Sequence, residues 1–224
     1  MSEMSPPKDS KIANNEALSS RLRHVYWIGG GSGAGKSTIA KRLADQCGLR
    51  HYSTDETMGE HGRRTPPEER PFVCAFNKMD MDERWLKRSP ETMLETFHFF
   101  RGECFDRIVD DVLEFPSDRP VVVEGFRLLP NLVKPLLHMI NQSVWLLPTP
   151  EFRLAAFKSR KTLWNIAEKT SNPERALQNL LVRDGLFTDY LRKETQSAGL
   201  PAIEVDASVT QDALFDQVAK QFGL

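Results

Sequence analysis

The apolar positions of the chain form short runs rich in Val and Ile that alternate with longer segments of helical periodicity. The runs cover residues 24–29, 49–53, 120–125, 142–147 and 201–206. Apolar strands separated by helices are typical of a parallel sheet covered on both faces, because such strands are buried on both sides. The pattern therefore predicts an α/β fold with about five parallel strands.

A helix is expected directly after the first run. Its apolar side chains recur on one face with a period near 3.6 residues, which suits packing on the sheet. They are Ile39, Ala40, Leu43, Ala44 and Cys47. Gly48 is placed to end this helix, since glycine readily adopts the left-handed conformation found at helix ends.

Two connections are far longer than the roughly 2 to 6 residues that usually join a strand to a helix. The first runs from about 54 to 119 and the second from about 149 to 200. Long insertions of this kind are usually functional, so substrate specificity is expected to lie in them.

Each insertion is expected to end in a helix. In the first, Ser89 is a predicted N-cap with Pro90 at the first helical position, and an apolar stripe from Met93 continues to Val112. The second insertion is helical and carries several arginines. Its last long helix is expected to start at Asn172 and the following proline.

The length of the chain and its first residues indicate how it is divided into a tail and a domain. At 224 residues the chain suits one domain, over 23–224. Residues 1–22 have no apolar signal-peptide core and are expected to be a mobile tail followed by a short helix capped at Asn14 or Asn15. No uncharged apolar stretch reaches the roughly 18 residues of a membrane-spanning helix. The prediction is a cytoplasmic protein with no membrane partner.

The composition is that of an ordinary globular protein. Basic and acidic side chains number 30 and 31. Without an excess of positive charge, nucleic acid is not the expected partner. Cys47, Cys74 and Cys104 have neither disulfide-framework nor zinc-finger spacing, and reduced side chains are expected.

The strongest motif is a glycine loop between the first predicted strand and its helix. The stretch GGSGAGKS from Gly30 to Ser37 satisfies G-x-x-x-x-G-K-[ST] in the strand–helix context that the motif requires. Glycines let backbone N–H groups point into one concavity, and the helix N-terminus adds partial positive charge, so a nucleotide triphosphate such as ATP fits there. The predicted nucleotide-binding residues are Gly30, Gly31, Ser32, Gly33, Ala34, Gly35, Lys36, Ser37 and Thr38.

Within the loop, Lys36 is expected to bridge the β- and γ-phosphates, Ser37 to bind Mg²⁺ through its hydroxyl, and Thr38 to lie near the α-phosphate. The alternative is a glycine-rich turn with a solvated lysine. The motif leaves open whether the nucleotide is transferred, hydrolysed or only sensed.

A guanine-specific site is disfavoured. The stretch NKMD at 77–80 fits N-K-x-D, but it lies within the first insertion and not after a late strand. A motif counts only in its structural context.

Two carboxylates follow predicted strands. Asp55 comes just after the second strand and Glu124 ends the third, so both are expected at the carboxyl-terminal edge of the sheet beside the phosphate loop. Asp55 is assigned as the group that orients an acceptor hydroxyl and takes its proton, and Glu124 as a holder of Mg²⁺, directly or through water. The alternatives are a helix-capping acid for Asp55 and a buried structural carboxylate for Glu124.

These stretches together resemble the adenylate-kinase-like group of P-loop small-molecule kinases. The resemblance rests on GGGSGAGKST, HYSTDE, VVVEGFR and VRDGLFTDYLRKE, and it covers roughly 24–56, 120–150 and 175–222. It implies a P-loop NTPase three-layer sandwich with helical acceptor and lid insertions at about 54–119 and 149–200.

The resemblance also implies roles for further residues. Asp55 would lie at the acceptor, and Asp206 and Ala207 would lie near adenine, chiefly through backbone. Arg127 in EGFR would meet a substrate anion, although one residue of the group's D-G-F-P-R pattern is missing here. The residues that resemble lid arginines are Arg153, Arg160 and Arg183, and Arg160 and Arg183 are assigned as catalytic residues that neutralise the transferring phosphoryl group. For each of them the alternative is a solvated helical arginine or a surface ion pair.

The first insertion does not resemble the acceptor domain of any nucleotide kinase. Arg63 and Arg64, with His61, Trp85 and Arg88, suit an anionic or aromatic acceptor pocket, and they equally suit a solvated loop. Whether the acceptor group is a hydroxyl or a phosphate is left open.

The function that these residues favour is transfer of the γ-phosphate of ATP, with Mg²⁺, to a small molecule. The alternative is an ATPase or nucleotide-sensing regulator that binds a protein partner through the same insertions. The sequence predicts no oligomeric state.

Overall fold

The structure, a computed structural model, describes the backbone of residues 8–160 and 163–224 and the side chains of 15–157 and 163–224. Its centre is a five-stranded parallel sheet in the order β2-β3-β1-β4-β5. The strands are β1 (Val25–Gly30), β2 (Arg50–Ser53), β3 (Val121–Glu124), β4 (Ser143–Pro148) and β5 (Ala202–Val205). Each coincides with a predicted apolar run, which confirms the predicted α/β fold.

The register aligns the strand ends that carry polar groups. Ile28 of β1 lies opposite Glu124 of β3, and Glu124 lies opposite Ser53 at the end of β2. Because the strands are parallel, the residues that follow β1, β2 and β3 emerge at one edge of the sheet. The glycine loop, Asp55 and Glu124 therefore share that edge.

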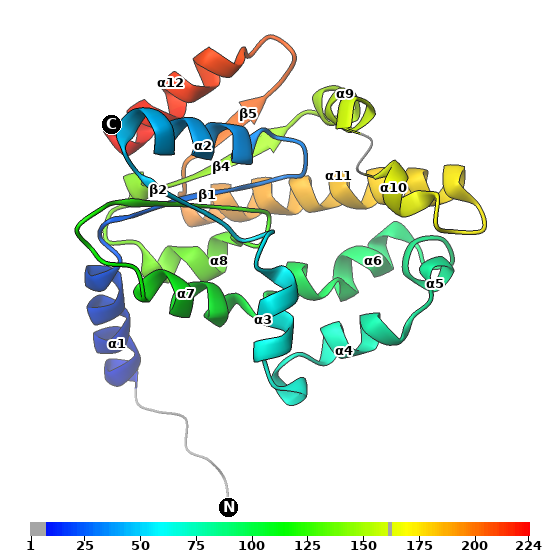
Figure 1. Cartoon of the computed structure of the whole chain (residues 1–224), viewed down its shortest axis with the longest axis horizontal. Coiled ribbons are helices and arrows are strands. Elements are labelled where there is room, and N and C mark those ends of the chain that lie inside the picture. The colour runs from blue at the N-terminus through cyan, green and yellow to red at the C-terminus, as the bar shows by residue number, and fades with distance from the viewer. Residues whose placement is uncertain (1–7, 161–162) are drawn as a thin grey trace, which may run out of the picture.

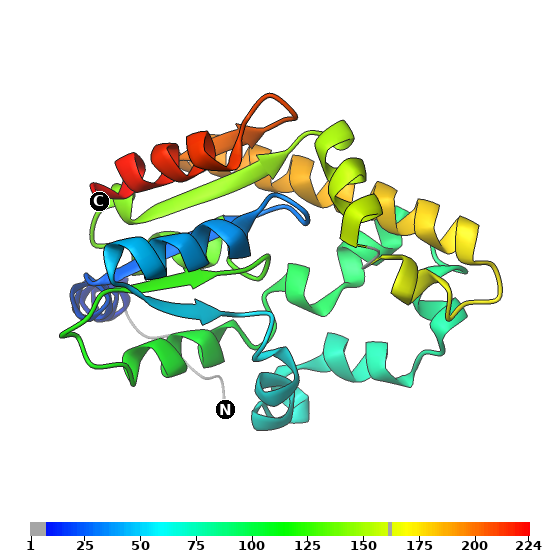
Figure 2. The same cartoon turned by 45° about the horizontal axis from the view of Figure 1, so that its top comes forward.

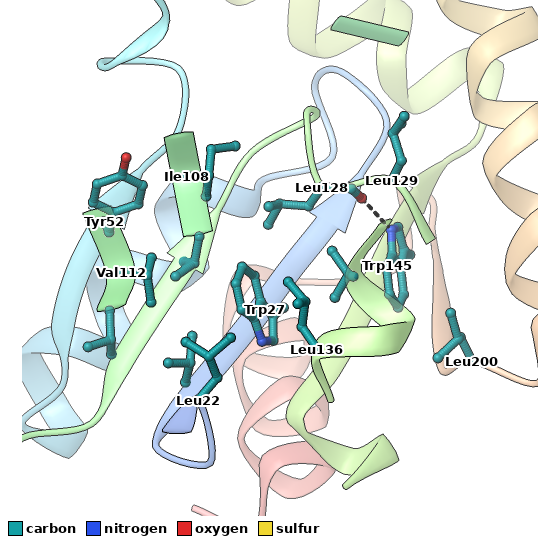
Figure 3. Packing of buried hydrophobic residues seen from close by; sticks show 14 of the residues in the cluster. Leu22, Trp27, Tyr52, Ile108, Val112, Leu128, Leu129, Leu136, Trp145 and Leu200 are labelled. Atoms are coloured by element: carbon teal, nitrogen blue, oxygen red, sulfur yellow. Dashed lines mark hydrogen bonds between the residues drawn. The ribbon is translucent and has the colours of Figure 1, made fainter. Parts of the chain in front are cut away.

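Helices cover both faces of the sheet and give three layers (Figures 1 and 2). On one face α2 (Lys36–Cys47) and α12 (Gln211–Phe222) pack on apolar side chains of the strands. The other face holds the larger core, which includes Trp27 and Trp145 (Figure 3). The Trp145 indole N–H donates to the carbonyl oxygen of Leu128 at 2.9 Å, so this core satisfies one of its buried polar groups.

The first insertion, between β2 and β3, is helical throughout. Its elements are α3 (Met58–Arg64), η1 (Pro67–Glu69), α4 (Pro71–Lys78), α5 (Met81–Trp85), α6 (Pro90–Thr96), η2 (His98–Arg101) and α7 (Phe105–Leu113).

The helix predicted from Ser89 to Val112 is interrupted. Ser89 caps α6 through Thr92 N–H, and Pro90 is its first residue, as expected. The helix stops at Thr96, and the chain then turns through Gly102 and Cys104, whose φ angles are 82° and 63°. Because a left-handed residue cannot continue a right-handed helix, α7 is a separate helix at a new angle.

Between β3 and β4 the chain forms only short elements, namely α8 (Pro130–Val133), η3 (Lys134–Leu136) and η4 (Ile140–Gln142). The second insertion follows β4 and contains α9 (Pro150–Arg160), α10 (Trp164–Ala167) and α11 (Pro173–Ala198). Asn172 caps α11 by accepting from Arg175 N–H, as predicted.

Helix α11 belongs to two cores. Its C-terminal half places Phe187 and Leu191 in the core beside the sheet. Its N-terminal half places Ala176 and Leu180 in a third apolar cluster with Met93 of the first insertion. Helix α11 is therefore a core helix, and the lid expected over 149–200 stays a prediction.

The N-terminal helix is longer than expected. Helix α1 spans Lys8–Arg21, so Asn14 and Asn15 lie inside it and do not cap it. The first seven residues of the predicted tail lie outside the described residues. Within the described part of the chain, no helix is long and apolar enough to cross a membrane.

Candidate functional site

The glycine loop connects β1 to α2 and curves around a concavity. Gly30 has φ 130° and packs so closely on β4 that a Cβ there would overlap the Leu146 carbonyl oxygen, so only glycine fits. Helix α2 begins at Lys36 behind Gly35, without a side-chain cap. Its first-turn N–H groups thus face the loop, as an anion-binding site requires.

Lys36 lies over this loop. Its ammonium group donates to the Gly31 carbonyl oxygen at 2.8 Å, and the side chain is buried. Its charge also lowers the pKa of both Asp55 and Glu124, although burial acts more strongly on each of them. The lysine therefore lies close to both predicted carboxylates.

Glu124 is a buried carboxylate with unused hydrogen-bonding capacity. Its side chain is 1% exposed, and neither oxygen has a hydrogen-bond partner among the described residues. The His51 Nε2 lies 3.8 Å from Oε1, beyond hydrogen-bond range. Burial opposes ionisation, but His51, Lys36 and the nearby hydroxyls of Ser53 and Ser37 outweigh it and lower the Glu124 pKa. An ionised buried carboxylate needs a partner, and a hydrated cation supplies one.

Asp55 follows β2 in the turn before α3. Helix α3 begins after Thr57 without any side-chain cap, which contradicts the capping interpretation of Asp55. The residue surface is exposed, yet the protein around the carboxylate removes part of its hydration. This desolvation is the largest cause of a raised Asp55 pKa, the Glu124 charge adds to it, and Lys36 and Arg127 oppose it.

A cavity of about 340 Å³ opens beside the loop. It is lined by the loop, α9 and the start of α12: Gly33, Ala34, Gly35, Thr38, Ile39, Phe152, Ala155, Ala156, Val205, Val209, Gln211 and Leu214. A largely apolar cavity next to a phosphate-binding loop suits a flat base.

Asp206 and Ala207 lie between two residues of this lining, Val205 and Val209, but are not part of it. The Asp206 carboxylate accepts from the Ser208 backbone N–H at 2.8 Å and from its hydroxyl at 2.6 Å, which lowers the Asp206 pKa. Asp206 thus shapes the loop, and its contact with adenine stays a prediction.

Arg153 of α9 lies beside the phosphate loop. Its Nη1 donates to the Thr188 hydroxyl at 3.2 Å, and a Cβ on Gly33 would lie 3.8 Å from its Cγ. Burial lowers the Arg153 pKa. The predicted role with the nucleotide is compatible with this position but is not tested by it.

Arg183 lies in the middle of α11, where Nε and Nη2 donate to Asp184 Oδ1 at 3.0 and 2.6 Å. Its guanidinium lies 5.2 to 5.5 Å from the ring centroids of Trp85, Phe97 and Phe100. Arg183 is therefore a buried residue beside aromatic side chains of the first insertion, and its contact with the phosphates stays a prediction. The side chain of Arg160, the other predicted catalytic arginine, lies outside the described residues.

Arg127 lies inside the protein. Its Nη1 donates to the Thr54 carbonyl oxygen and its Nη2 to that of Cys104, both at 3.0 Å, and the guanidinium faces the ring of Phe99. With both terminal nitrogens bonded to backbone, Arg127 ties the first insertion to the sheet. These bonds speak against the predicted contact with a substrate anion.

The residues predicted to line an acceptor pocket, on α3 and at Arg88, have different surroundings in the structure. Arg63 is exposed, whereas Arg64 donates to Asp111 Oδ1 on α7 at 2.6 Å. His61 is fully buried, with its Nε2 at 2.8 Å from Asp111 Oδ2. Arg88 hydrogen-bonds to Thr96 and to nearby carbonyl groups. Arg63 and Arg64 are both exposed, and substrate binding by either arginine stays a prediction.

Sequence reasoning missed His51 and Asp111. His51 was recoverable, since strand alternation places residues 51 and 53 on one face and Ser53 pairs with Glu124. Asp111 was not, because only the fold brings it to His61, 50 positions earlier. Among the described residues, no group of three or more His, Cys, Asp or Glu side chains has metal-binding geometry.

No protein-family profile matches the chain, and no curated protein matches its sequence. Several solved structures are similar to it. One is an uncharacterized protein from Eubacterium ventriosum, with 15% identity over 89% of this chain and 97% of the other, at a TM-score of 0.48.

Two further similar structures are enzymes. Deoxyadenosine kinase from M. mycoides with bound dATP shares 12% identity over 89% of this chain and 100% of its own, at a TM-score of 0.46. Shikimate kinase from Acinetobacter baumannii in complex with shikimate shares 18% identity over 92% and 93%, at a TM-score of 0.40.

The sheet and the loop define the class of the protein without these likenesses. A parallel sheet in the order β2-β3-β1-β4-β5 with helices on both faces, and a G-x-x-x-x-G-K-[ST] loop between β1 and α2, make the fold a three-layer α/β sandwich with a phosphate-binding-loop motif.

Proposed function

We propose that this protein is a Mg²⁺-dependent phosphotransferase that moves the γ-phosphate of ATP to a small molecule. The observation that carries the proposal is the pair of carboxylates beside the loop. Asp55 and Glu124 interact with each other and with Lys36, and their pKa values are shifted in opposite directions. Two neighbouring carboxylates with different environments suit two different roles in one reaction.

The loop and Lys36 have the task of holding the triphosphate. The N–H groups at the start of α2 would bind the phosphate oxygens, and the apolar cavity beside Phe152 and Val205 would hold the base. Lys36 would then exchange its bond to the Gly31 carbonyl for bonds to the β- and γ-phosphates.

Asp55 is the proton acceptor in this proposal. The acceptor hydroxyl oxygen attacks the γ-phosphorus, its proton passes to the Asp55 carboxylate, the bond from the γ-phosphorus to the bridging oxygen breaks, and ADP leaves. The raised pKa of Asp55 supports this role, because a base whose pKa approaches the working pH transfers protons efficiently.

Glu124 and Ser37 fit the binding of Mg²⁺. The Glu124 oxygens are buried without a hydrogen-bond partner among the described residues, and the Ser37 hydroxyl lies near them. Carboxylate and hydroxyl oxygens are the ligands that this ion prefers, often through water. The bound ion would neutralise charge that develops on the transferring phosphates.

The test measures ADP release by the purified protein with ATP and Mg²⁺, alone and with a panel of small-molecule hydroxyl and phosphate compounds. A phosphotransferase releases ADP rapidly only with its acceptor, and a phosphorylated product forms in equal amount. Lys36→Ala should abolish this release, whereas Lys41→Ala, an exposed lysine on the same helix, should not.

Other outcomes would contradict the proposal. Steady ADP release that no compound accelerates would indicate an ATPase. Nucleotide binding without turnover, together with a nucleotide-dependent protein partner, would indicate a sensing regulator.

A further inference from the structure

Buried hydrogen bonds to Thr54 hold the turn that carries Asp55. The carbonyl oxygen of Thr54 accepts from Arg127 Nη1 at 3.0 Å and from the Thr57 hydroxyl at 3.2 Å. The backbone N–H of Thr54 donates to the Glu124 carbonyl oxygen at 2.9 Å. Thr54 is fully buried, so the residue before Asp55 has little freedom.

Arg127 continues this arrangement to His61. The same Nη1 lies 3.1 Å from His61 Nδ1. A guanidinium group can only donate, so Nδ1 must accept, and the imidazole proton must sit on Nε2. From there it donates to Asp111 Oδ2 at 2.8 Å. The contacts on its two sides thus define a neutral His61 with one tautomer.

Asp111 closes the network around the other end of the turn. It accepts from the Tyr52 hydroxyl at 2.7 Å, and Tyr52 lies in β2 three residues before Asp55. The charged and titratable groups that face His61 are therefore Asp111 from α7, Arg127 after β3, Tyr52 from β2 and, on its own helix, Arg64.

We propose that His61 is a positioning residue, which holds Asp55 in place for proton transfer through Arg127 and Thr54 and does so only while its imidazole is neutral. The proposal rests on the role proposed above for Asp55. His61 itself touches neither the nucleotide loop nor Asp55 and is not a catalytic residue.

Protonation would break the network at a defined atom. A second ring proton must sit on Nδ1, where it would point at the Arg127 guanidinium. Burial lowers the His61 pKa, Asp111 opposes this, and the charge of Arg127 adds to the lowering. The folded state therefore prefers the neutral ring, so the network should be intact at and above the ordinary histidine pKa of 6.5 and break only as the pH falls through the lowered pKa of His61 in the folded protein.

The experiment compares two variants that remove different parts of the imidazole. In His61→Asn the amide oxygen can still accept from Arg127, but the side chain cannot titrate. In His61→Leu both contacts are lost. We expect kcat to fall about tenfold or more in the leucine variant, with an unchanged KM for ATP, because a slightly misplaced base costs rate and not nucleotide binding.

The asparagine variant separates the hydrogen bond to Arg127, which it keeps, from the titration of the imidazole, which it lacks. It should retain most of the rate and lose the part of the acid decline of kcat that protonation of His61 adds to that of Asp55. His24→Asn is the matched control, since His24 precedes β1 at the opposite edge of the sheet. A leucine variant with wild-type kcat, or an asparagine variant whose acid decline of kcat is the same as that of the wild type, would overturn the proposal.

Two measurements on the wild type keep the proposal testable if no acceptor is phosphorylated or the leucine variant does not fold. ¹⁵N NMR should find the His61 proton on Nε2 at neutral pH, and a proton on Nδ1 would overturn the proposal. The protection factors of the amides of residues 54–57, which correct for the pH dependence of intrinsic exchange, should fall in the wild type as the pH drops through the His61 pKa, but not in His61→Asn. Absence of transfer with both results positive would contradict the proposed function alone.

Discussion

Asp55 and Glu124 differ in their surroundings more than in their chemistry. The His51 ring, the Ser53 hydroxyl and the Lys36 ammonium group lie near Glu124, and together they outweigh its burial and lower its pKa. Asp55 has only a long contact of 3.5 Å from the Thr54 hydroxyl, and partial desolvation raises its pKa. The fold thus keeps one carboxylate ionised and makes the other a better proton acceptor.

Asp55→Asn should separate transfer from binding. The rate to a hydroxyl acceptor should fall by about a hundredfold or more, in the range that general-base catalysis contributes. ATP affinity should change little, because Lys36 and the loop remain. With a phosphate acceptor the loss would lie mainly in acceptor binding. Intact transfer at saturating acceptor would remove Asp55 from the reaction.

The same variant should be more stable than the wild type at neutral pH. The folded-state pKa of Asp55 is raised, so folding disfavours its charged form, and the wild type loses this part of its stability as the pH rises past the ordinary value of 3.8. Asparagine carries no charge at any pH. Melting temperatures of both proteins should therefore agree near pH 3 and diverge above it. A lower melting temperature for the variant at neutral pH would contradict the assigned environment.

Glu124→Gln should abolish the effect of Mg²⁺ on nucleotide binding. The amide removes the charge that favours a hydrated cation, while the loop that binds the phosphates is unchanged. Calorimetric titration with ATP should show tighter binding with Mg²⁺ than without it for the wild type, and equal binding for the variant. Glu114→Gln, an exposed residue after α7, is the control. A wild-type Mg²⁺ effect in Glu124→Gln would contradict the site.

Sequence reasoning found the residues whose role follows from a local pattern. Gly30 and Lys36 belong to a motif, and Asp55 and Glu124 follow strands whose ends must meet in a parallel sheet. Contacts between distant segments could not be predicted in this way. Arg127 carries the same charge whether it faces a ligand or a backbone carbonyl, and only tertiary packing decides which.

At the scale of the elements, the end of β1 is the most constrained part of the site. Gly30 joins β1 to the loop, with a positive φ and with β4 in direct contact. An added Cβ would meet backbone, which cannot move aside without parting the two strands. The shape of the phosphate loop therefore depends on the pairing of β1 with β4.

Gly30→Ala should destabilise the protein more than Gly48→Ala does. Gly48 also has a positive φ, 71°, but no atom lies within 4 Å of its added Cβ, so only the left-handed backbone costs about 1 to 2 kcal/mol there. Gly30→Ala adds a backbone clash and should also lose ATP binding. Denaturant unfolding and nucleotide titration of both variants measure this, and equal losses of stability would contradict the described packing.

Strands were easier to predict than the helices of the first insertion. Each strand is a short apolar run that the sheet buries on both faces, so its pattern is local. The stripe from Met93 to Val112 is also local, but the break between α6 and α7 depends on Gly102 and Cys104, and cysteine gives no signal for a left-handed turn. The apolar residues keep their helical spacing on both sides of this break, so the spacing alone predicts one continuous helix.

At the scale of the whole molecule, the cavity beside the loop lies where helix α9 meets the cores around the sheet. The sheet, α2 and α11 are joined by buried apolar cores. Helix α9 contributes Phe152 and Ala156 to the cavity beside the loop and follows β4 directly. The proposed phosphotransferase must exclude water from the γ-phosphate, so in this proposal the parts around the cavity close on binding.

Hydrogen exchange should locate this closure. With ATP, Mg²⁺ and acceptor bound, amides of 54–70 and 150–157 should become more protected, while those in the middle of α11, around Arg183, should change little. Exchange of the free and the ligand-bound protein, followed by peptide mass spectrometry, measures the difference. Equal protection of 54–70 and 150–157 in both states would exclude closure, and a large change in α11 would contradict its place in the core.

Helix α11 also limits how such a protein can change its substrate during evolution. One continuous helix supplies Phe187 to the sheet and Leu180 to the first insertion, with Arg183 between them. A different acceptor module grafted in place of residues 54–119 would leave the N-terminal half of this helix without its apolar partners. New specificity therefore requires matched substitutions in two distant stretches of the gene, and recombination that exchanges the insertion alone should yield insoluble protein.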